Sequence, residues 1–254
     1  MGCRICGAAK TVKSHIIPRA LMFDIRGDEP YLHTVTQDQM GTKFSQSGPI
    51  DDQILCLLHE QQTEDADRYG IEFCRRVIAE VPQNGERALV QNSNPDLLVR
   101  FACLIVWRHC ISKHGPGICA LGPYGQQLQT AIFDDVSRLP ILYLARNHLR
   151  MDNQTESTIA LAPFPVRLAD VRCWLFSVSG VQFYLKLDKR SLPGDGESFA
   201  ANGADPVTLL QLGPTLAHNV PILQSMMANM VLRRKPGSPR SKPVSPPQIP
   251  AYHS

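Results

Sequence analysis

Two short-spaced pairs of soft metal ligands constrain this chain more than any other feature of its sequence. The first pair is Cys3 and Cys6 in the string CRICG, and the second is Cys56 and His59 in the string ILCLLHE. Thiolate and imidazole are donors that zinc prefers, and four of them form a closed tetrahedral structural site. The two spacings therefore predict that one zinc ion joins the start of the chain to the beginning of a helix near position 57.

The gap of 49 residues between the two pairs leaves a second interpretation open. In that interpretation Cys3 and Cys6 are exposed thiols, and Cys56 packs in the core as a small apolar side chain. Residues 1–23 lack the apolar stretch of a secretory signal, so we expect a cytoplasmic protein. In a reducing compartment its eight cysteines are thiols or metal ligands rather than disulfides.

The length and charge of the chain exclude some classes of protein. Its 254 residues are enough for one or two domains with a full core. No apolar run reaches the roughly 20 residues that span a bilayer, so we expect no membrane segment. Without the basic residues 233–254, 21 Lys and Arg face 23 Asp and Glu, which is not the balance of a globally basic nucleic-acid binder. Residues 1–23 nevertheless carry four basic and no acidic side chains, which predicts a local positive patch.

The pattern of apolar and polar residues predicts an α+β fold in three segments. Residues 1–80 are expected to form a zinc-stapled ββα unit, with a long polar loop at 27–49 and a helix at about 57–79. Residues 81–232 are expected to form a second α+β domain with a central helix and a β-hairpin. Residues 233–254, rich in Pro and Ser, are expected to be a disordered basic tail.

The second segment has the clearest local signals. Asn94 followed by Pro95 predicts the start of a helix that is apolar on most sides and therefore central. In this helix we expect Arg108 to pack its stem and extend its charge to solvent. Ser179-Gly180 separates two alternating apolar runs, which predicts a hairpin with a two-residue turn. Further expected elements are a helix at 125–137 and a buried strand at 139–146.

The strings CRICG, KSHIIPR and ILCLLHE together resemble the zinc-containing HNH-like proteins of bacteria and phages, a branch of the ββα-metal nuclease superfamily. The resemblance covers about residues 1–65, and SHIIP is its most specific part. It implies that His15 is a general base, which accepts a proton from the water that attacks a phosphodiester. It also implies that Asp51 orients this histidine.

The same resemblance places a second metal ion near the base. Glu60 and Glu64 fall where the superfamily keeps metal-binding histidines, which implies Mg²⁺ or Mn²⁺ held by their carboxylates. Ser14 is a difference, because the superfamily usually has an acidic residue or a histidine there. Plain structural roles stay open: a buried, hydrogen-bonded His15, and a solvated helix face of Glu60 and Glu64 opposite Arg68.

Two functions follow. One is an HNH-like endonuclease that cleaves nucleic acid, with DNA favoured over RNA. The alternative is a non-catalytic, zinc-stabilised adaptor that binds nucleic acid or a protein partner. Met226, Met227 and Met230 lie on one face of a predicted helix near the C-terminus, which is either core or a surface for such a partner.

Overall fold

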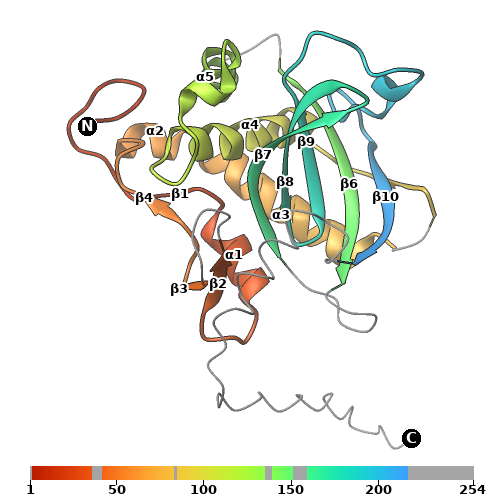
Figure 1. Cartoon of the computed structure of the whole chain (residues 1–254), viewed down its shortest axis with the longest axis horizontal. Helices are drawn as coiled ribbons and strands as arrows, with labels where there is room; N and C mark the ends of the chain where they lie inside the picture. Colours follow the sequence, from red (N-terminus) through yellow and green to blue (C-terminus); the bar gives the residue numbers. More distant parts are fainter. Residues whose placement is uncertain (1, 36–41, 83–84, 135–138, 151–158, 217–254) are drawn as a thin grey trace, which may run out of the picture.

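A computed structural model (Figure 1) describes residues 2–35, 42–82, 85–134, 139–150 and 159–216. The chain folds into a six-stranded sheet, helices packed beside it, and a smaller N-terminal part of short strands and helices. The predicted α+β class is confirmed. The predicted Met-rich helix and basic tail lie outside the described residues.

The sheet has the strand order β5-β10-β6-β9-β8-β7. All neighbouring strands are antiparallel except β10 and β6, which are parallel. The bounds are β5 (Arg87–Val90), β6 (Ile141–Arg150), β7 (Ala160–Leu168), β8 (Val171–Val178), β9 (Val181–Lys186) and β10 (Val207–Leu216). The sequence indicated β6, β8 and β9, whereas β5, β7 and β10 were not predicted.

The hairpin of β8 and β9 has the predicted turn at Ser179-Gly180. Both turn residues have positive φ angles, 52° and 81°, as a type I′ hairpin turn requires. Phe176 and Phe183 stand opposite each other across the two strands. Their rings stack with centroids 4.6 Å apart, so this face of the hairpin belongs to the core.

Three longer helices pack beside the sheet (Figure 1): α3 (Glu64–Glu80), α4 (Pro95–Ile111) and α5 (Tyr124–Phe133). Helix α4 is central, as expected, and almost all of its residues from Leu98 to Arg108 are buried. The Asn94 side chain caps it by accepting a hydrogen bond from the Leu97 N–H at 3.1 Å. Single turns of 3-10 helix are η1 (Ile118–Leu121) and η2 (Gly196–Phe199). Among the described residues, no helix has the length and apolar character needed to cross a membrane.

The N-terminal part consists of short elements. They are β1 (Ser14–His15), α1 (Arg19–Arg26), β2 (Leu32–Val35), β3 (Thr42–Ser45), β4 (Ile50–Asp51) and α2 (Leu57–Gln61). β1 pairs with β4, and β2 pairs with β3, both in antiparallel fashion. Helix α1, directly after Pro18, was not predicted. Buried side chains from this part, among them Cys3, Ile16 and Ile54, join the same hydrophobic cluster as α4 and the sheet.

The helix predicted as continuous over 57–79 is divided at Gln62-Thr63. Thr63 is buried, and its hydroxyl donates a hydrogen bond to the Glu60 carbonyl at 2.7 Å. The Thr63 N–H donates to the same carbonyl at 3.0 Å, which tightens the chain into a turn. The helix is interrupted by a hydrogen bond of one hydroxyl group. The spacing of apolar residues, from which a continuous helix was predicted, carries no information about such a bond.

Candidate metal centre

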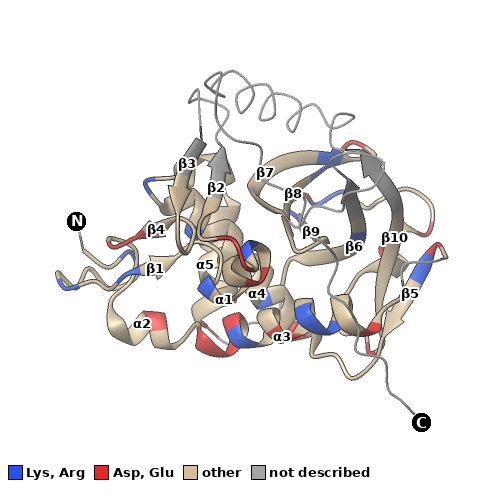
Figure 2. Cartoon of the chain, turned by 90° about the horizontal axis from the view of Figure 1, so that it is seen from below, with Lys and Arg blue, Asp and Glu red and all other residues tan. Residues whose placement is uncertain are grey.

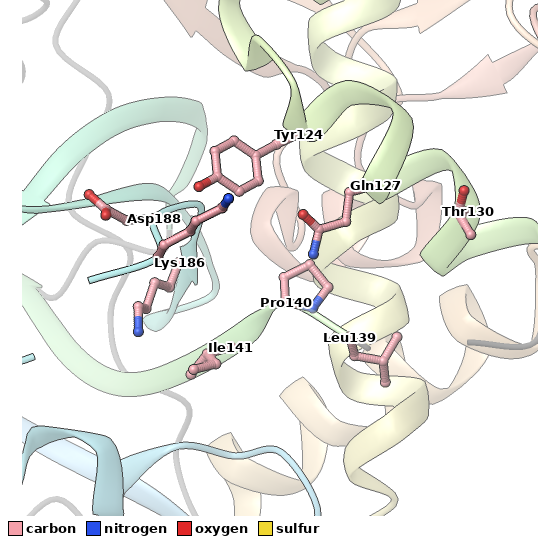
Figure 3. A pocket seen from close by; sticks show the side chains of 9 residues that line it. Tyr124, Gln127, Thr130, Leu139, Pro140, Ile141, Lys186 and Asp188 are labelled. Carbon is pink, nitrogen blue, oxygen red and sulfur yellow. The ribbon is translucent and has the colours of Figure 1, made fainter. Parts of the chain in front are cut away.

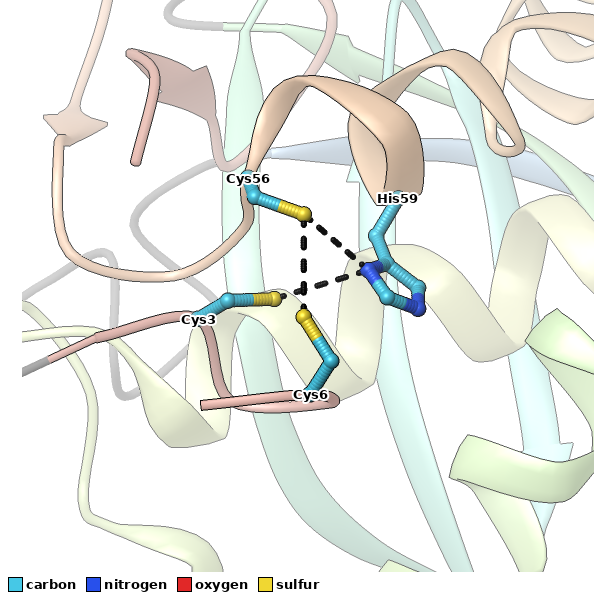
Figure 4. A group of neighbouring side chains, drawn as sticks. All are labelled: Cys3, Cys6, Cys56 and His59. Atoms are coloured by element: carbon cyan, nitrogen blue, oxygen red, sulfur yellow. Dashed lines mark hydrogen bonds between the residues drawn. The ribbon is translucent and has the colours of Figure 1, made fainter. Parts of the chain in front are cut away.

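Four donor atoms converge between the N-terminus and the start of α2. The side chains of Cys3, Cys6, Cys56 and His59 point toward one another (Figure 4), and their donor atoms all lie within 4.8 Å of one another. The His59 Nδ1 is 3.6 Å from the Cys3 sulfur and 3.1 Å from the Cys56 sulfur. The Cys6 and Cys56 sulfurs are 3.9 Å apart. The structure thus brings together the four ligands that the sequence indicated.

These separations suit a tetrahedral ion. Bond lengths of about 2.3 Å to sulfur and 2.0–2.1 Å to nitrogen separate tetrahedral donors by roughly 3.6–3.8 Å. The donor set is three thiols and one imidazole, which is the chemistry of a closed metal site. The residues present therefore fit a structural metal ion of the zinc type.

Backbone hydrogen bonds form the knuckle that carries Cys3 and Cys6. The Cys3 N–H donates to the Ala8 carbonyl at 2.8 Å, and the Gly7 N–H donates to the Cys3 carbonyl at 2.9 Å. Gly7 has a φ of 74°, which a residue with a side chain adopts only with strain. The Arg4 N–H donates to the Ile54 carbonyl at 2.8 Å, which holds the knuckle against the segment that leads into α2.

The surroundings of the cluster favour metal binding and fix its position. Burial alone would raise the pKa of the Cys3 thiol, but hydrogen bonds from backbone groups of Cys6 and Cys56 lower it to about 6. A thiol with such a pKa is mostly thiolate at neutral pH, the form that binds metals. The His59 ring meets Phe133 of α5 edge-on, with centroids 5.6 Å apart. The candidate site therefore packs against helix α5.

His15 lies at the end of β1 and is half-buried. Burial lowers the pKa of its imidazole, and the positive charge of Arg19 lowers it further, while Glu60 opposes the shift. The ring is consequently neutral near pH 7. Its Nε2 is shielded from solvent and has no hydrogen-bond partner within the described part of the chain.

Glu60 is the centre of a network of charged and polar side chains next to His15. Its Oε2 accepts a hydrogen bond from the Ser14 hydroxyl at 2.7 Å, and its Oε1 lies 3.2 Å from Arg108 Nη2. Arg108, only 1% exposed, also donates to Asp67 Oδ2 at 2.8 Å and to the Thr63 hydroxyl at 2.7 Å. One buried guanidinium thus pairs with two carboxylates, so the group carries one net negative charge when both are ionised, and burial together with the charge of Glu60 raises the pKa of Asp67.

The expectation that Arg108 extends its charge to solvent is wrong. The guanidinium turns inward to the carboxylates of α2 and α3, although the sequence separates it from Glu60 by 48 residues. A buried arginine is stable only when its charge is paired. The apolar residues around Arg108 in the sequence could therefore have indicated a buried ion pair. The partners themselves were not readable from that signal.

Asp51 stands opposite Ser14 in the β1–β4 pair, whereas His15 is opposite Ile50. Its carboxylate accepts hydrogen bonds from the backbone N–H of Gln53 at 2.8 Å and of Lys113 at 2.7 Å. Both oxygens are therefore engaged with the backbone, and the described contacts include none between Asp51 and the His15 side chain. Asp51 joins β4 to the end of α4.

Glu64 is exposed at the first turn of α3. It lines an open hollow of about 440 Å³ together with Glu60 and Asp67 on one side and Ala20 of α1 on the other. Figure 2 shows acidic residues, in red, on the ribbon of α2 and at the beginning of α3, and basic residues, in blue, farther along α3. Since Glu60 and Glu64 lie on two helices and Glu60 is bound by Ser14 and Arg108, the pair does not form a ready-made cation site.

A second hollow, of about 460 Å³, lies between α5 and the ends of β6 and β9 (Figure 3). Tyr124 and Gln127 of α5 face Lys186 and Asp188 across it. Lys186 is ion-paired with Glu197 at 2.6 Å, and Asp188 is bound by Arg190. These charges are satisfied within the protein, and none of the residues that line the hollow is a ligand of the candidate metal centre.

Comparison of the chain with protein-family models, curated proteins and solved structures gives no match.

Proposed function

We propose that the N-terminal part is an HNH-like nuclease site, in which a structural zinc ion holds the chain and His15 acts as general base on a phosphodiester. The zinc ion would be bound by Cys3, Cys6, Cys56 and His59. Four protein donors leave no open coordination position, so this ion stabilises the fold and does not touch the substrate.

The environment of His15 carries the proposal. A general base must be unprotonated at the working pH and must have a free acceptor atom. The pKa of His15 is lowered, and among the described residues its Nε2 has no hydrogen-bond partner. Because Nε2 is shielded from solvent in this structure, the proposed step also requires that substrate binding admits a water molecule to it. In the proposed step, Nε2 takes a proton from a water molecule, the water oxygen bonds to phosphorus, and the bond from phosphorus to the ester oxygen breaks.

A divalent cation, Mg²⁺ or Mn²⁺, belongs to the proposal as a group that binds from solution. Glu64 is exposed and Glu60 lines the same hollow, so these two residues are the available ligands. Such an ion would stabilise negative charge on the leaving oxygen. To bind Glu60 it must compete with Arg108, which predicts weak affinity for the cation.

Nicking of supercoiled plasmid DNA tests the proposal. The wild-type protein with its zinc retained is expected to nick DNA when Mg²⁺ or Mn²⁺ is added. His15→Ala should lower the rate by about 10²-fold or more, because general-base catalysis contributes roughly 10²–10⁴-fold. His114→Ala is the matched control, since His114 is an exposed histidine whose ring contacts the Ile50 carbonyl at 2.9 Å. Cleavage that persists in His15→Ala would refute the role of this residue.

A second function, binding without cleavage, is favoured by a different observation. Arg108 and Ser14 occupy both oxygens of Glu60, Asp51 is engaged with backbone groups, and His15 Nε2 is closed off from solvent. On this alternative the zinc-stabilised unit is an adaptor for nucleic acid or a protein partner. It predicts no nicking with any divalent cation, together with a complex whose affinity is the same for wild type and His15→Ala.

A further inference from the structure

A strip of arginine and aromatic side chains runs along α1 and onto the hairpin of β2 and β3. We call it the α1 strip, and it consists of Arg19, Phe23, Arg26, Tyr31 and Phe44. Three of its members lie in α1, Tyr31 directly precedes β2, and Phe44 is in β3. Direct contacts join the members within each of two groups.

The first half of the α1 strip is a ring between two guanidinium groups. Arg19 and Arg26 lie four residues before and three residues after Phe23, so all three share one face of α1. The Arg19 guanidinium carbon is 4.7 Å from the centre of the Phe23 ring, and that of Arg26 is 4.6 Å away. These cation–π contacts hold both positive groups in fixed places on the surface.

The second half is a pair of exposed aromatic rings. Tyr31 is 47% exposed and Phe44 is 65% exposed. Their ring centroids are 6.2 Å apart in an edge-on arrangement. A hydrogen bond ties the two groups of elements together, because Arg26 Nη1 donates to the carbonyl of Gln46 at 3.1 Å, two residues beyond Phe44 and directly after β3.

The strip begins beside His15. Arg19 is close enough for its charge to act on the His15 imidazole. Asp24, the acidic residue of α1, is bound by Arg75 through contacts of 2.8 and 3.0 Å, so its charge is offset. Arg19 and Arg26 are thus the cations on this face of α1, and the exposed acids Asp28 and Glu29 lie in the turn between its end and Tyr31.

We propose that the α1 strip binds single-stranded nucleic acid and leads its backbone to His15. Exposed aromatic rings stack on bases, and arginines contact phosphates, which is the combination that proteins use for single strands. A duplex keeps its base faces stacked inside the helix, so Tyr31 and Phe44 have nothing to stack on unless the strand is open. This inference rests on the proposed nuclease function, because it names the form of nucleic acid that the site would cleave. Binding can nevertheless be measured without cleavage.

Fluorescence anisotropy with a labelled oligothymidylate and the matching duplex tests the strip, with no divalent cation added. The full chain should bind the single strand more tightly than the duplex. Phe44→Ala and Tyr31→Ala should each weaken binding by roughly 5- to 150-fold, the range measured for single stacked bases. Phe44→Trp should retain binding, because the larger ring still stacks. Leu89→Ala is the control: Leu89 is 57% exposed on β5, in the sheet, and its removal should change nothing.

The arginines give an independent measurement. Arg19→Gln and Arg26→Gln should each lower the slope of log affinity against log salt by about 0.7, the value for one phosphate contact on a single strand. Arg87→Gln, at an exposed position of β5, should leave the slope unchanged. Equal affinity for single strand and duplex, or affinities unaffected by Phe44→Ala and Tyr31→Ala, would overturn the inference.

The binding and nicking assays separate the two proposals. Strip-dependent binding, with no cleavage of either the plasmid or the labelled oligothymidylate when Mg²⁺ or Mn²⁺ is added, would support the α1 strip and refute the nuclease. Nicking that needs His15 but is indifferent to Phe44→Ala and Tyr31→Ala would support the nuclease and refute the strip. Failure to bind any oligonucleotide also refutes the strip, and it leaves a protein partner as the occupant of this face.

Discussion

Replacing Arg108 by methionine tests the buried charge network most directly. Methionine keeps much of the apolar stem and removes the cation, so Glu60 and Asp67 lose their shared counter-charge. Their side chains are only 24% and 20% exposed, which limits the help that water can give. Burial already raises the pKa of Asp67 in the wild-type protein, despite the opposing effect of Arg108.

The size of the effect follows from the cost of neutralising Asp67. Protonating a carboxyl with an ordinary pKa near 3.9 costs about 4 kcal/mol at pH 7, because each unit is worth about 1.36 kcal/mol. This cost is an upper limit, and breaking a buried ion pair typically costs about 3–5 kcal/mol. We therefore expect Arg108→Met to lower the free energy of unfolding by about 3–4 kcal/mol at pH 7. At pH 5.5 the loss should shrink to about 2 kcal/mol, since protonation is then easier.

Urea unfolding followed by the fluorescence of Trp107 and Trp174 measures this loss. Arg75→Met is the control, because it breaks a more exposed ion pair with Asp24 and should cost less than about 1 kcal/mol. Adding Asp67→Asn to Arg108→Met should recover most of the stability at pH 7. A loss below about 1 kcal/mol, or one that is the same at pH 7 and pH 5.5, would refute the electrostatic explanation.

Three other predictions concern the metal site, the helix packing and the pH dependence. Cys56→Ala should abolish binding of about one zinc ion per chain, which elemental analysis of the purified protein measures, and full retention of the ion would contradict the proposed site. Gly70→Ala should lower the melting temperature, because a Cβ at this position would lie 2.3 Å from the Phe101 ring. The cost of this overpacking is expected to exceed the gain in helix propensity of about 1 kcal/mol. A higher melting temperature would contradict this packing. Burial, aided by the charge of His114, lowers the pKa of His109 to about 4. The unfolded chain then binds more protons between about pH 6.5 and pH 4, so stability should fall by about 2–3 kcal/mol as the pH drops through this window, and His109→Gln should remove that part of the pH dependence.

The sequence was most informative where a structure depends on neighbouring residues. The cap at Asn94, the turn at Ser179-Gly180 and the apolar run of α4 follow from local backbone preferences, and all three are present. The sequence was least informative where a distant contact decides the outcome. Thr63 breaks the predicted helix through its own hydroxyl, which Arg108 of α4 also contacts.

Strand order is another property that only the tertiary structure decides. β10 lies between β5 and β6, antiparallel to β5 and parallel to β6. A strand pattern states which faces are apolar, but it does not specify which edge of a sheet the strand joins. The order is selected by the packing of the whole sheet against the helices.

For the candidate site, the sequence by itself determined the chemistry of the ligands. Cys3, Cys6, Cys56 and His59 are soft donors wherever they lie, and their short spacings place each pair on one turn of chain. Only the tertiary structure decided which charges share the interior with His15. Arg108 reaches Glu60 and Asp67 because α4 packs against α3, and a buried charge takes as partners whatever opposite charges the packing places within reach.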